Sequence, residues 1–505
     1  MHRLCTLYLT VDYLDALRYL YSLADFERSG RFADRPDVAP MLALLEELDN
    51  PHLGRPTVHI AGSKGKGSVA AVVSSLLRAH GLSVGLYTSP HLHRFTERIQ
   101  VDGEPISQEE FAAGIEHVKA AADRVLEKHP DRTLVTFDAL TALGFLIFRE
   151  RGVGAQVIEV GLGGTLDSTN VFGGALTPQP PLPSRRVGAG EGSIPPPLDG
   201  GGVVEPALSL PKGGGPHVAV ITNIGLEHRE ILGDTIAEIA AQKAGIIVPG
   251  APVVMAPQRE SAAEVIREVA AERGSPLTEV ATVCNLRRDS HSQDTQSFRL
   301  RTPGGGYQAK LPLVGKHQLD NAATAVVAFE KLAAAMASPS IGGGGAGLSV
   351  TEDAVKKGLE EAKWPGRIEI IRRRPLVVVD VAHTADSARR LRDAAAEYLH
   401  IDSATLVVGV MGDKDLEGLA MAIEPIARRV IATRANHPRA LDPEAVAKVF
   451  RDMGVETFWE KTVPDAIEAA LRLSQPIDSV VVLGSVALAG EARAHLLGLE
   501  LDPPV

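Results

Sequence analysis

The sequence has few cysteines, no excess of positive charge and no long hydrophobic run. Its two cysteines, Cys5 and Cys284, are too few for a disulfide framework or a thiolate metal site. Lys plus Arg total 52 against 63 Asp plus Glu, so the net charge of −11 provides no general basic field for nucleic acid or anionic lipid. The apolar start, "MHRLCTLYLTVDYL", is interrupted by Asp12 and is shorter than a signal peptide requires. We therefore expect a cytoplasmic protein without a nucleic-acid or membrane partner.

The chain is long enough for two large domains or three ordinary ones, because 505 residues exceed what one hydrophobic core usually organises. Short apolar runs rich in β-branched residues alternate with helix-period segments, which is typical of a parallel α/β sheet. Four candidate strands end near Gly62, Ser89, Glu159 and Asn223. Open α/β sheets bind ligands at the carboxyl ends of their strands, so these four positions predict one crevice.

Two segments interrupt this pattern. Residues 173–216 are rich in Pro and Gly without a period, which predicts a flexible insertion, and residues 337–349 have the composition of a Gly/Ser linker. A second alternating block begins after Trp364 and reads as a smaller doubly wound sheet. We predict an N-terminal parallel-sheet domain of the P-loop ATPase type over residues 1–364, and a Rossmann-like α/β domain over residues 365–505.

The stretch "HIAGSKGKGSVAA" resembles a phosphate loop but departs from the usual template, because Gly67 separates Lys66 from the hydroxyl of Ser68. Its glycines allow backbone N–H groups to close on an anion, and its lysine supplies a positive charge. An apolar run precedes the loop and an amphipathic helix follows it, as a phosphate site requires. We predict that Lys66 and Ser68 contact phosphate and metal; the alternative is a Gly-rich turn with a solvated lysine.

Glu159 ends the predicted strand "VIEV" and is placed to hold Mg²⁺ beside this loop, directly or through water. His228 follows another strand end, and Ser89 follows "VGLYT". Each residue alone also fits an ordinary structural role. Together with phosphate oxygens, the three side chains are a feasible set of ligands for a hard metal ion.

Lys243 lies on an apolar helical stripe that includes Ile236, Ile239 and Ala240, at spacings of 0, 3, 4 and 7. Burying an ammonium group is costly, so this lysine must reach solvent, find an anion or lose its charge chemically. Spacing alone leaves these alternatives open.

Four further polar residues occur at the starts and ends of predicted elements around the domain change. Asp380 stands where nucleotide folds often place an acid that binds a ribose hydroxyl. Each of the four has a helix-capping or turn-forming alternative. They are Asn321, Arg367, Asp380 and His383.

Taken together, these motifs resemble the folylpolyglutamate synthase and dihydrofolate synthase family of the Mur-ligase superfamily. The family loop G-T-N-G-K-G-S/T corresponds to residues 62–68, and the further matches occur in the family's order from about residue 13 onward. These matches are "YTSPHLHRFTERI", "VIEVGLGGTLDSTNV", "NIGLEH", "KAGII", "WPGRIE" and "GDKD".

The resemblance implies a set of site residues. ATP would contact Gly62, Ser63, Lys64, Gly65, Lys66, Gly67, Ser68, Asn321, Arg367 and Asp380. Magnesium ligands would be Ser89, Glu159 and His228, and a carbamylated lysine would be Lys243. The pterin region would include Phe137, Asp138 and Asp167. The catalytic set expected from these matches is Lys66, Lys243, His228 and His383.

The implied reaction is ATP-dependent addition of glutamate to a folate, and also to dihydropteroate, through an acyl phosphate. Mg²⁺ would be the cofactor, ATP a substrate, and the protein a monomer whose partners are small molecules. The alternatives are a dihydrofolate synthase alone, a Mur-type ligase for a cell-wall precursor, and a homologue that binds ATP without turnover.

This sequence departs from the family pattern at two places. Ser63 and Lys64 replace the commoner Thr-Asn, and "DVAHTA" replaces D-G-A-H-N-P. If position 381 needs a positive φ, Val381 would be costly there, and domain closure would be modified.

Overall fold

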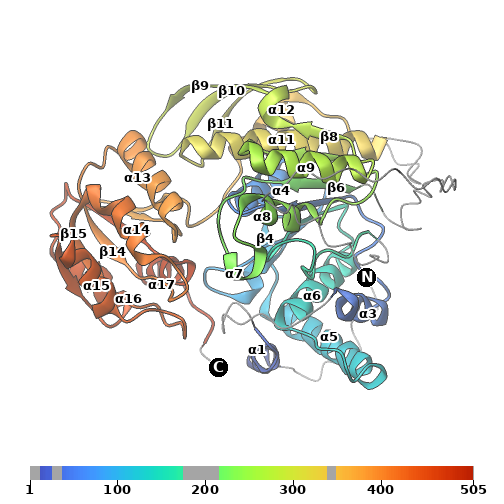
Figure 1. Ribbon diagram of the computed structural model, residues 1–505, viewed down its shortest axis with the longest axis horizontal. Coiled ribbons are helices and arrows are strands. Elements are labelled where there is room, and N and C mark those ends of the chain that lie inside the picture. The colour runs from blue at the N-terminus through green and yellow to red at the C-terminus, as the bar shows by residue number, and fades with distance from the viewer. Residues whose placement is uncertain (1–11, 26–36, 174–214, 216, 338–347, 504–505) are drawn as a thin grey trace, which may run out of the picture.

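The structure is a computed structural model, which describes residues 12–25, 37–173, 215, 217–337 and 348–503. The predicted insertion and linker therefore lie almost entirely outside the described residues. Within the described part, two parallel-rich sheets lie in separate halves of the chain, and a small antiparallel sheet lies near their junction (Figure 1). This architecture confirms the predicted mixed α/β fold class.

The first sheet has eight strands in the order β4-β3-β2-β5-β1-β6-β7-β8, of which β3 and β4 pair antiparallel and the others pair parallel. Its central strands consist wholly of buried residues, as expected for a parallel sheet covered on both faces. The strand bounds are β1 Thr57–Ala61, β2 Val84–Tyr87, β3 Ile99–Val101, β4 Glu104–Pro105, β5 Ala155–Glu159, β6 His217–Ile221, β7 Val253–Met255 and β8 Leu277–Glu279.

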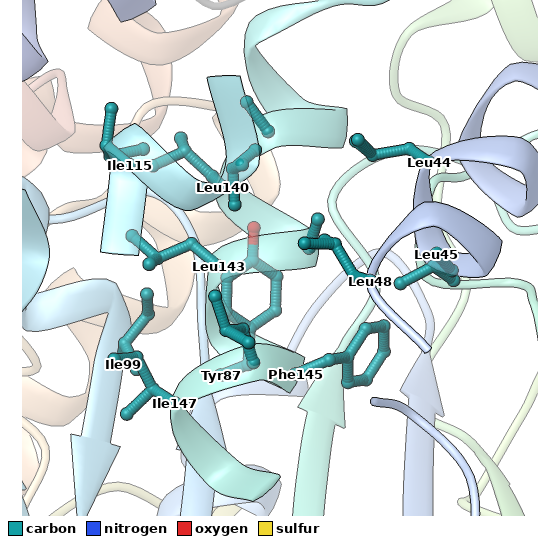
Figure 2. Close-up of a cluster of buried hydrophobic side chains, with 14 of the residues drawn as sticks. Leu44, Leu45, Leu48, Tyr87, Ile99, Ile115, Leu140, Leu143, Phe145 and Ile147 are labelled. Atoms are coloured by element: carbon teal, nitrogen blue, oxygen red, sulfur yellow. The ribbon is translucent and has the colours of Figure 1, made fainter. Parts of the chain in front are cut away.

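Successive residues of the central strands point to opposite faces and enter different cores. Ile158 belongs to the cluster under helices α1, α3, α5 and α6, part of which Figure 2 shows, whereas Val157 belongs to the cluster under α4, α11 and α12. A smaller cluster lies under α8 and α9. The helices of this half are α1 Tyr13–Ser22, α3 Ala39–Glu47, α4 Lys66–Ala79, α5 Gln108–Lys128, α6 Thr136–Glu150, α7 Arg229–Leu232, α8 Ile236–Ala244, α9 Glu260–Glu272, α10 Val280–Val283, α11 Lys316–Ala337 and α12 Glu352–Glu360, with the 3₁₀ turn η1 Phe95–Arg98.

An antiparallel sheet in the order β11-β10-β9 follows the first sheet, and the sequence analysis did not anticipate it. Its strands are β9 Asn285–His291, β10 Gln296–Arg301 and β11 Gly306–Leu311. Alternate residues of β10 and β11 are buried, which is the pattern of a sheet with one covered face. It contacts the second half of the chain through Arg288, which forms an ion pair of 2.5 Å with Glu397.

The second large sheet has six strands in the order β12-β13-β17-β14-β15-β16, with β12 antiparallel. Trp364, near which we predict the change of domain, lies between α12 and β12. The strands are β12 Glu369–Arg373, β13 Leu376–Val379, β14 Ala404–Val408, β15 Ala427–Ala432, β16 Glu456–Trp459 and β17 Ser479–Leu483. The helices are α13 Ala385–Leu399, α14 Leu416–Ile423, α15 Pro443–Asp452, α16 Val463–Arg472 and α17 Val486–Leu497, with the 3₁₀ turn η3 Glu424–Ile426.

In the described residues, no helix is both long and apolar enough to cross a membrane.

Candidate active site

A cavity of about 790 Å³ lies between the two halves of the chain, at the carboxyl ends of strands from both large sheets. The four strand ends singled out in the sequence all contribute to its wall or to the loops that form it, as the topology of parallel sheets predicts. The predicted site residues that line it are Ser63, Lys64, Gly65, Lys66, Gly67, Ser68, Ser89, Phe137, Glu159, Asp167, His228, Asn321, Arg367, Asp380 and His383.

The glycine loop connects β1 to α4, as the sequence predicts. Gly65 is the N-cap of α4 at φ +92°, and a Cβ there would lie 2.4 Å from Oδ1 of Asn321, so no larger residue fits without displacement. The first amides of α4 have no partner within the helix and carry the positive end of its dipole. Lys66 is the first residue of this helix. The loop thus has the geometry of an anion site.

Two loop residues anchor the loop to the segment after β6. The amides of Ser63 and Lys64 each donate to the carbonyl of Asn223 at 3.0 Å, and the Ser63 hydroxyl donates to the carbonyl of Gly225 at 3.0 Å. These two amides are therefore engaged within the protein. Contact of Ser63 and Lys64 with ATP stays a prediction.

Lys243 finds an anion inside the protein. Its side chain is 2% exposed, and its Nζ donates to the carbonyl of Gly62 at 2.9 Å and to Oε1 of Glu227 at 3.0 Å. Nζ of Lys64 lies 3.8 Å from the other oxygen of Glu227. Burial favours the protonated form of Glu227, but the charges of Lys243, Lys64 and Lys66 outweigh it and lower the pKa of Glu227 to about 2.

Glu227 is the residue that the sequence analysis missed. Its signal was present, because this carboxylate stands directly before His228 in the quoted segment "NIGLEH". Lys243 and Glu227 are separated by 16 positions and lie in α8 and in the loop before α7. Only the fold brings them together.

The proposed metal ligands lie on the same cavity. Glu159 is 4% exposed at the end of β5, and its Oε2 accepts a hydrogen bond from the amide of Ser89 at 3.2 Å. Burial raises the pKa of Glu159, and the charge of Lys66 opposes that shift. Burial lowers the pKa of His228 to about 4, which keeps its ring neutral near pH 7.

These donors fit a hard cation in their chemistry, since a buried carboxylate, a hydroxyl and phosphate oxygens are what Mg²⁺ prefers. In the part of the chain that the structure describes, no three His, Cys, Asp or Glu side chains form a ready-made metal cluster. Ser89, Glu159 and His228 stay predicted ligands.

On the second domain, Asp380 joins two loops. Its Oδ2 accepts from the amide of Ile368 at 2.8 Å and its Oδ1 accepts from the amide of Ala382 at 2.7 Å. Each oxygen keeps a second lone pair, so contact with a ribose hydroxyl stays a prediction. Burial lowers the pKa of Arg367, and the neighbouring carboxylate of Asp380 opposes that shift.

His383 is held by a hydrogen bond of 2.9 Å between its Nδ1 and the carbonyl of Val381. A carbonyl only accepts, so Nδ1 carries the proton and Nε2 is an acceptor. Burial lowers the pKa of His383 to about 3. Val381 is not among the described residues with positive φ, so the condition under which this valine would be costly is not met.

The predicted pterin residues separate into two groups. Phe137 and Asp167 line the cavity, whereas Asp138 is fully buried and is not part of its wall. The carboxylate of Asp138 accepts hydrogen bonds from the amide of Val135 at 3.0 Å and the hydroxyl of Ser168 at 2.7 Å. Asp138 therefore lies behind the wall of the cavity, and its place in the pterin region stays a prediction.

Comparisons with known proteins identify the family of this chain. Residues 212–329 match the Mur ligase middle domain, and residues 366–486 match the Mur ligase, glutamate ligase domain. Folylpolyglutamate synthase of Lacticaseibacillus casei is 31% identical over 490 residues, covering 97% of this chain and 99% of the relative. Dihydrofolate synthase/folylpolyglutamate synthase of Bacillus subtilis is 29% identical and covers 92% of this chain and 96% of the relative.

Solved structures of folylpolyglutamate synthases are also similar to this chain. Folylpolyglutamate synthase of Mycobacterium tuberculosis, complexed with ADP and AMPPCP, superimposes with a TM-score of 0.78 at 28% identity, covering 96% of this chain and 99% of that one. The chain belongs to the folylpolyglutamate synthase and dihydrofolate synthase family of Mur-type ligases, and it is an ATP-dependent, amide-forming enzyme.

Proposed function

We propose that this enzyme adds L-glutamate to the carboxylate of a tetrahydrofolate, and of dihydropteroate, through an acyl phosphate. The observation that carries the proposal is one cavity that joins the glycine loop and Lys66 of the first domain to Arg367 and His383 of the second. Relatives named folylpolyglutamate synthase and dihydrofolate synthase support it, as does a neighbouring structure described as an AMPPCP and folate complex, with a TM-score of 0.73 and 30% identity.

The acceptor would enter the apolar part of the cavity, whose wall includes Tyr21, Phe95, Phe137 and Leu140. Flat aromatic ligands pack well against such side chains. The acceptor carboxylate would then point toward the glycine loop, where Lys66 begins α4.

In the first step, the acceptor carboxylate attacks the γ-phosphorus of ATP, a new C–O–P linkage forms, and the bond to the ADP leaving group breaks. Lys66 and the first amides of α4 stabilise the charge on the phosphoryl oxygens. Ser89, Glu159 and His228 would hold Mg²⁺, which supplies additional positive charge to the same oxygens when bound.

In the second step, the amine of glutamate attacks the acyl carbon, the amide bond forms and phosphate leaves. His383 presents Nε2 as a neutral acceptor and would orient the incoming amine. Lys243, paired with Glu227, would hold the glycine loop through its hydrogen bond to the carbonyl of Gly62. In this proposal Lys243 works as an ammonium ion or, as the family resemblance implies, in a carbamylated form.

The test is mass spectrometry of products formed from ATP, Mg²⁺ and glutamate, with dihydropteroate and with tetrahydrofolate in separate reactions. Glutamate added to both acceptors supports the full proposal, and addition to dihydropteroate alone assigns dihydrofolate synthase. If glutamate is added to neither acceptor in the presence of ATP, the remaining alternative is a homologue that binds ATP without turnover. Lys66→Ala is the matched control, because it should abolish product without disturbing the acceptor wall.

A monomeric state and a cytoplasmic location stay predictions of the sequence.

A further inference from the structure

The segment 89–98, named here the acceptor loop, runs from Ser89 to Arg98 and lies between the two domains. Six of its residues line the cavity: Ser89, Pro90, His91, Leu92, Phe95 and Arg98. Within the loop, Nε of the buried Arg98 donates to Nδ1 of His91 at 2.9 Å, and the rings of His91 and Phe95 lie 4.4 Å apart. The loop therefore forms part of the wall to which the proposed function assigns the acceptor.

A buried arginine of the second domain holds one side of this loop. Arg493 lies in α17 and is 8% exposed. Its Nε and Nη2 bind the two carboxylate oxygens of Glu369 at 2.7 and 3.0 Å, and its Nη1 lies 2.9 Å from Nε2 of His93. The other nitrogen of His93 contacts Glu97 at 2.7 Å. The four side chains form one chain of hydrogen bonds from the second domain into the acceptor loop.

The packing around this contact is close. A Cβ at Gly490 would lie 2.0 Å from the carbonyl oxygen of Leu92, so α17 touches the loop backbone at a position where only glycine fits. The side chain of Leu92 packs against the core of the second domain, although Leu92 belongs to the first. The loop and α17 thus share a packed interface as well as hydrogen bonds.

The segment after α17 holds the opposite side of the loop. It runs from α17 toward α1 of the first domain (Figure 1). Oδ2 of Asp502 accepts from the amide of Phe95 at 2.7 Å, Oδ1 accepts from the hydroxyl of Tyr13 at 2.8 Å, and the amide of Asp502 donates to the carbonyl of His93 at 2.9 Å. One aspartate therefore fixes the backbone on both sides of Arg94.

We propose that Arg493 and Asp502 are positioning residues that hold the acceptor loop in its binding conformation, so that the acceptor wall is complete only when the second domain is docked. The inference rests on the proposed function for the identity of the acceptor. The contacts that join the two domains do not depend on that function.

The experiment compares Arg493→Met and Asp502→Ala with the wild-type enzyme. The KM for the folate acceptor is expected to rise about tenfold or more, which corresponds to about 1.4 kcal/mol, while the KM for ATP changes less than about twofold. Hydrogen exchange of the peptide containing residues 89–98 is expected to accelerate about tenfold in both variants. The control is Arg428→Met, which breaks an ion pair with Asp478 at the amino-terminal ends of β15 and β17.

The exchange measurement is made with AMPPCP and does not need turnover. If the wild-type enzyme glutamylates neither acceptor, the proposed function fails, and exchange in residues 89–98 still decides the role of the two residues. Unchanged exchange and unchanged acceptor KM in both variants would overturn the inference. Equal rises in the KM for ATP and for the acceptor would also overturn it, because they would assign Arg493 and Asp502 to general maintenance of the fold.

Discussion

The ammonium group of Lys243 lies 3.0 Å from a carboxylate oxygen of Glu227, at a depth where only 2% of the lysine side chain is exposed. A pair this deeply buried is retained only if each charge neutralises the other. The same ammonium group binds the carbonyl of Gly62, the first residue of the glycine loop. The conformation of the loop is therefore tied to a buried ion pair.

Replacing Glu227 with Gln should destabilise the enzyme by about 3 kcal/mol, because the buried ammonium of Lys243 loses its counter-charge. Urea denaturation monitored by circular dichroism measures this change. The double variant Glu227→Gln with Lys243→Met should recover most of the lost stability, since no charge is then buried, and should stay inactive. A double variant as unstable as the single one would show that the ion pair is not the cause.

Replacing Glu159 with Gln should reduce turnover by about 100-fold or more, because the side chain loses the charge that is proposed to bind Mg²⁺. Glutamine keeps an oxygen that can accept the hydrogen bond from the amide of Ser89, so the fold should be preserved. Turnover is measured as a function of Mg²⁺ concentration. If the activity and the Mg²⁺ dependence of the variant equal those of the wild type, Glu159 is not a metal ligand.

The stability of the enzyme should fall as the pH drops from about 6.5 toward 4. His52, His59 and His217 lie around Phe172 in the first domain and are buried. Burial lowers the pKa of His52 and of His217 to about 4, and that of His59 well below its usual range. The unfolded chain therefore binds protons that the folded protein does not.

The stabilisation from these neutral rings is fully present above the unfolded pKa and is lost as the pH falls toward the folded one, by roughly 3 kcal/mol for each of His52 and His217. The free energy of unfolding, measured in urea between pH 7 and pH 4.5, gives the slope of stability against pH. His217→Leu should reduce that slope by about one proton, because it removes one of the titrating rings. Among the described residues, Nε2 of His217 has no hydrogen-bond partner, so the substitution breaks no hydrogen bond at that atom. A slope that is identical in the variant would contradict the assignment.

Val381→Gly should leave the catalytic rate within about twofold of the wild type and should cost about 1 kcal/mol of stability or more. Val381 has ordinary backbone geometry and is 7% exposed, so glycine removes packing without relieving strain. Steady-state kinetics and thermal unfolding measure the two effects. A large gain in rate would mean that the valine restricts domain closure.

Much of the site could be predicted from the sequence because its residues occur at features that are recognisable within a single loop, strand or helix. Lys66 follows a glycine loop, Glu159 and Asp380 come at or directly after strand ends, and Lys243 occupies an apolar helical stripe. These patterns depend on spacing within one element, which periodicity reveals. Spacing did not reveal that Asp138 lies below the cavity wall or that Val381 has no positive φ, because neither depth below a surface nor backbone angle is encoded in spacing.

The sequence by itself determined the alternating α/β architecture, since it follows from hydrophobic periodicity. The change of domain near Trp364 and the chemistry of the glycine loop stay predictions, which rest on that periodicity and on the conformational freedom of glycine. Only the tertiary structure decided which polar groups meet. Glu227 pairs with Lys243, Arg493 with His93, and Asp502 with Phe95 and Tyr13, in the last case across 489 positions of the chain. Such contacts depend on how strands order in a sheet and how two domains dock, and these arise from the packing of the whole chain.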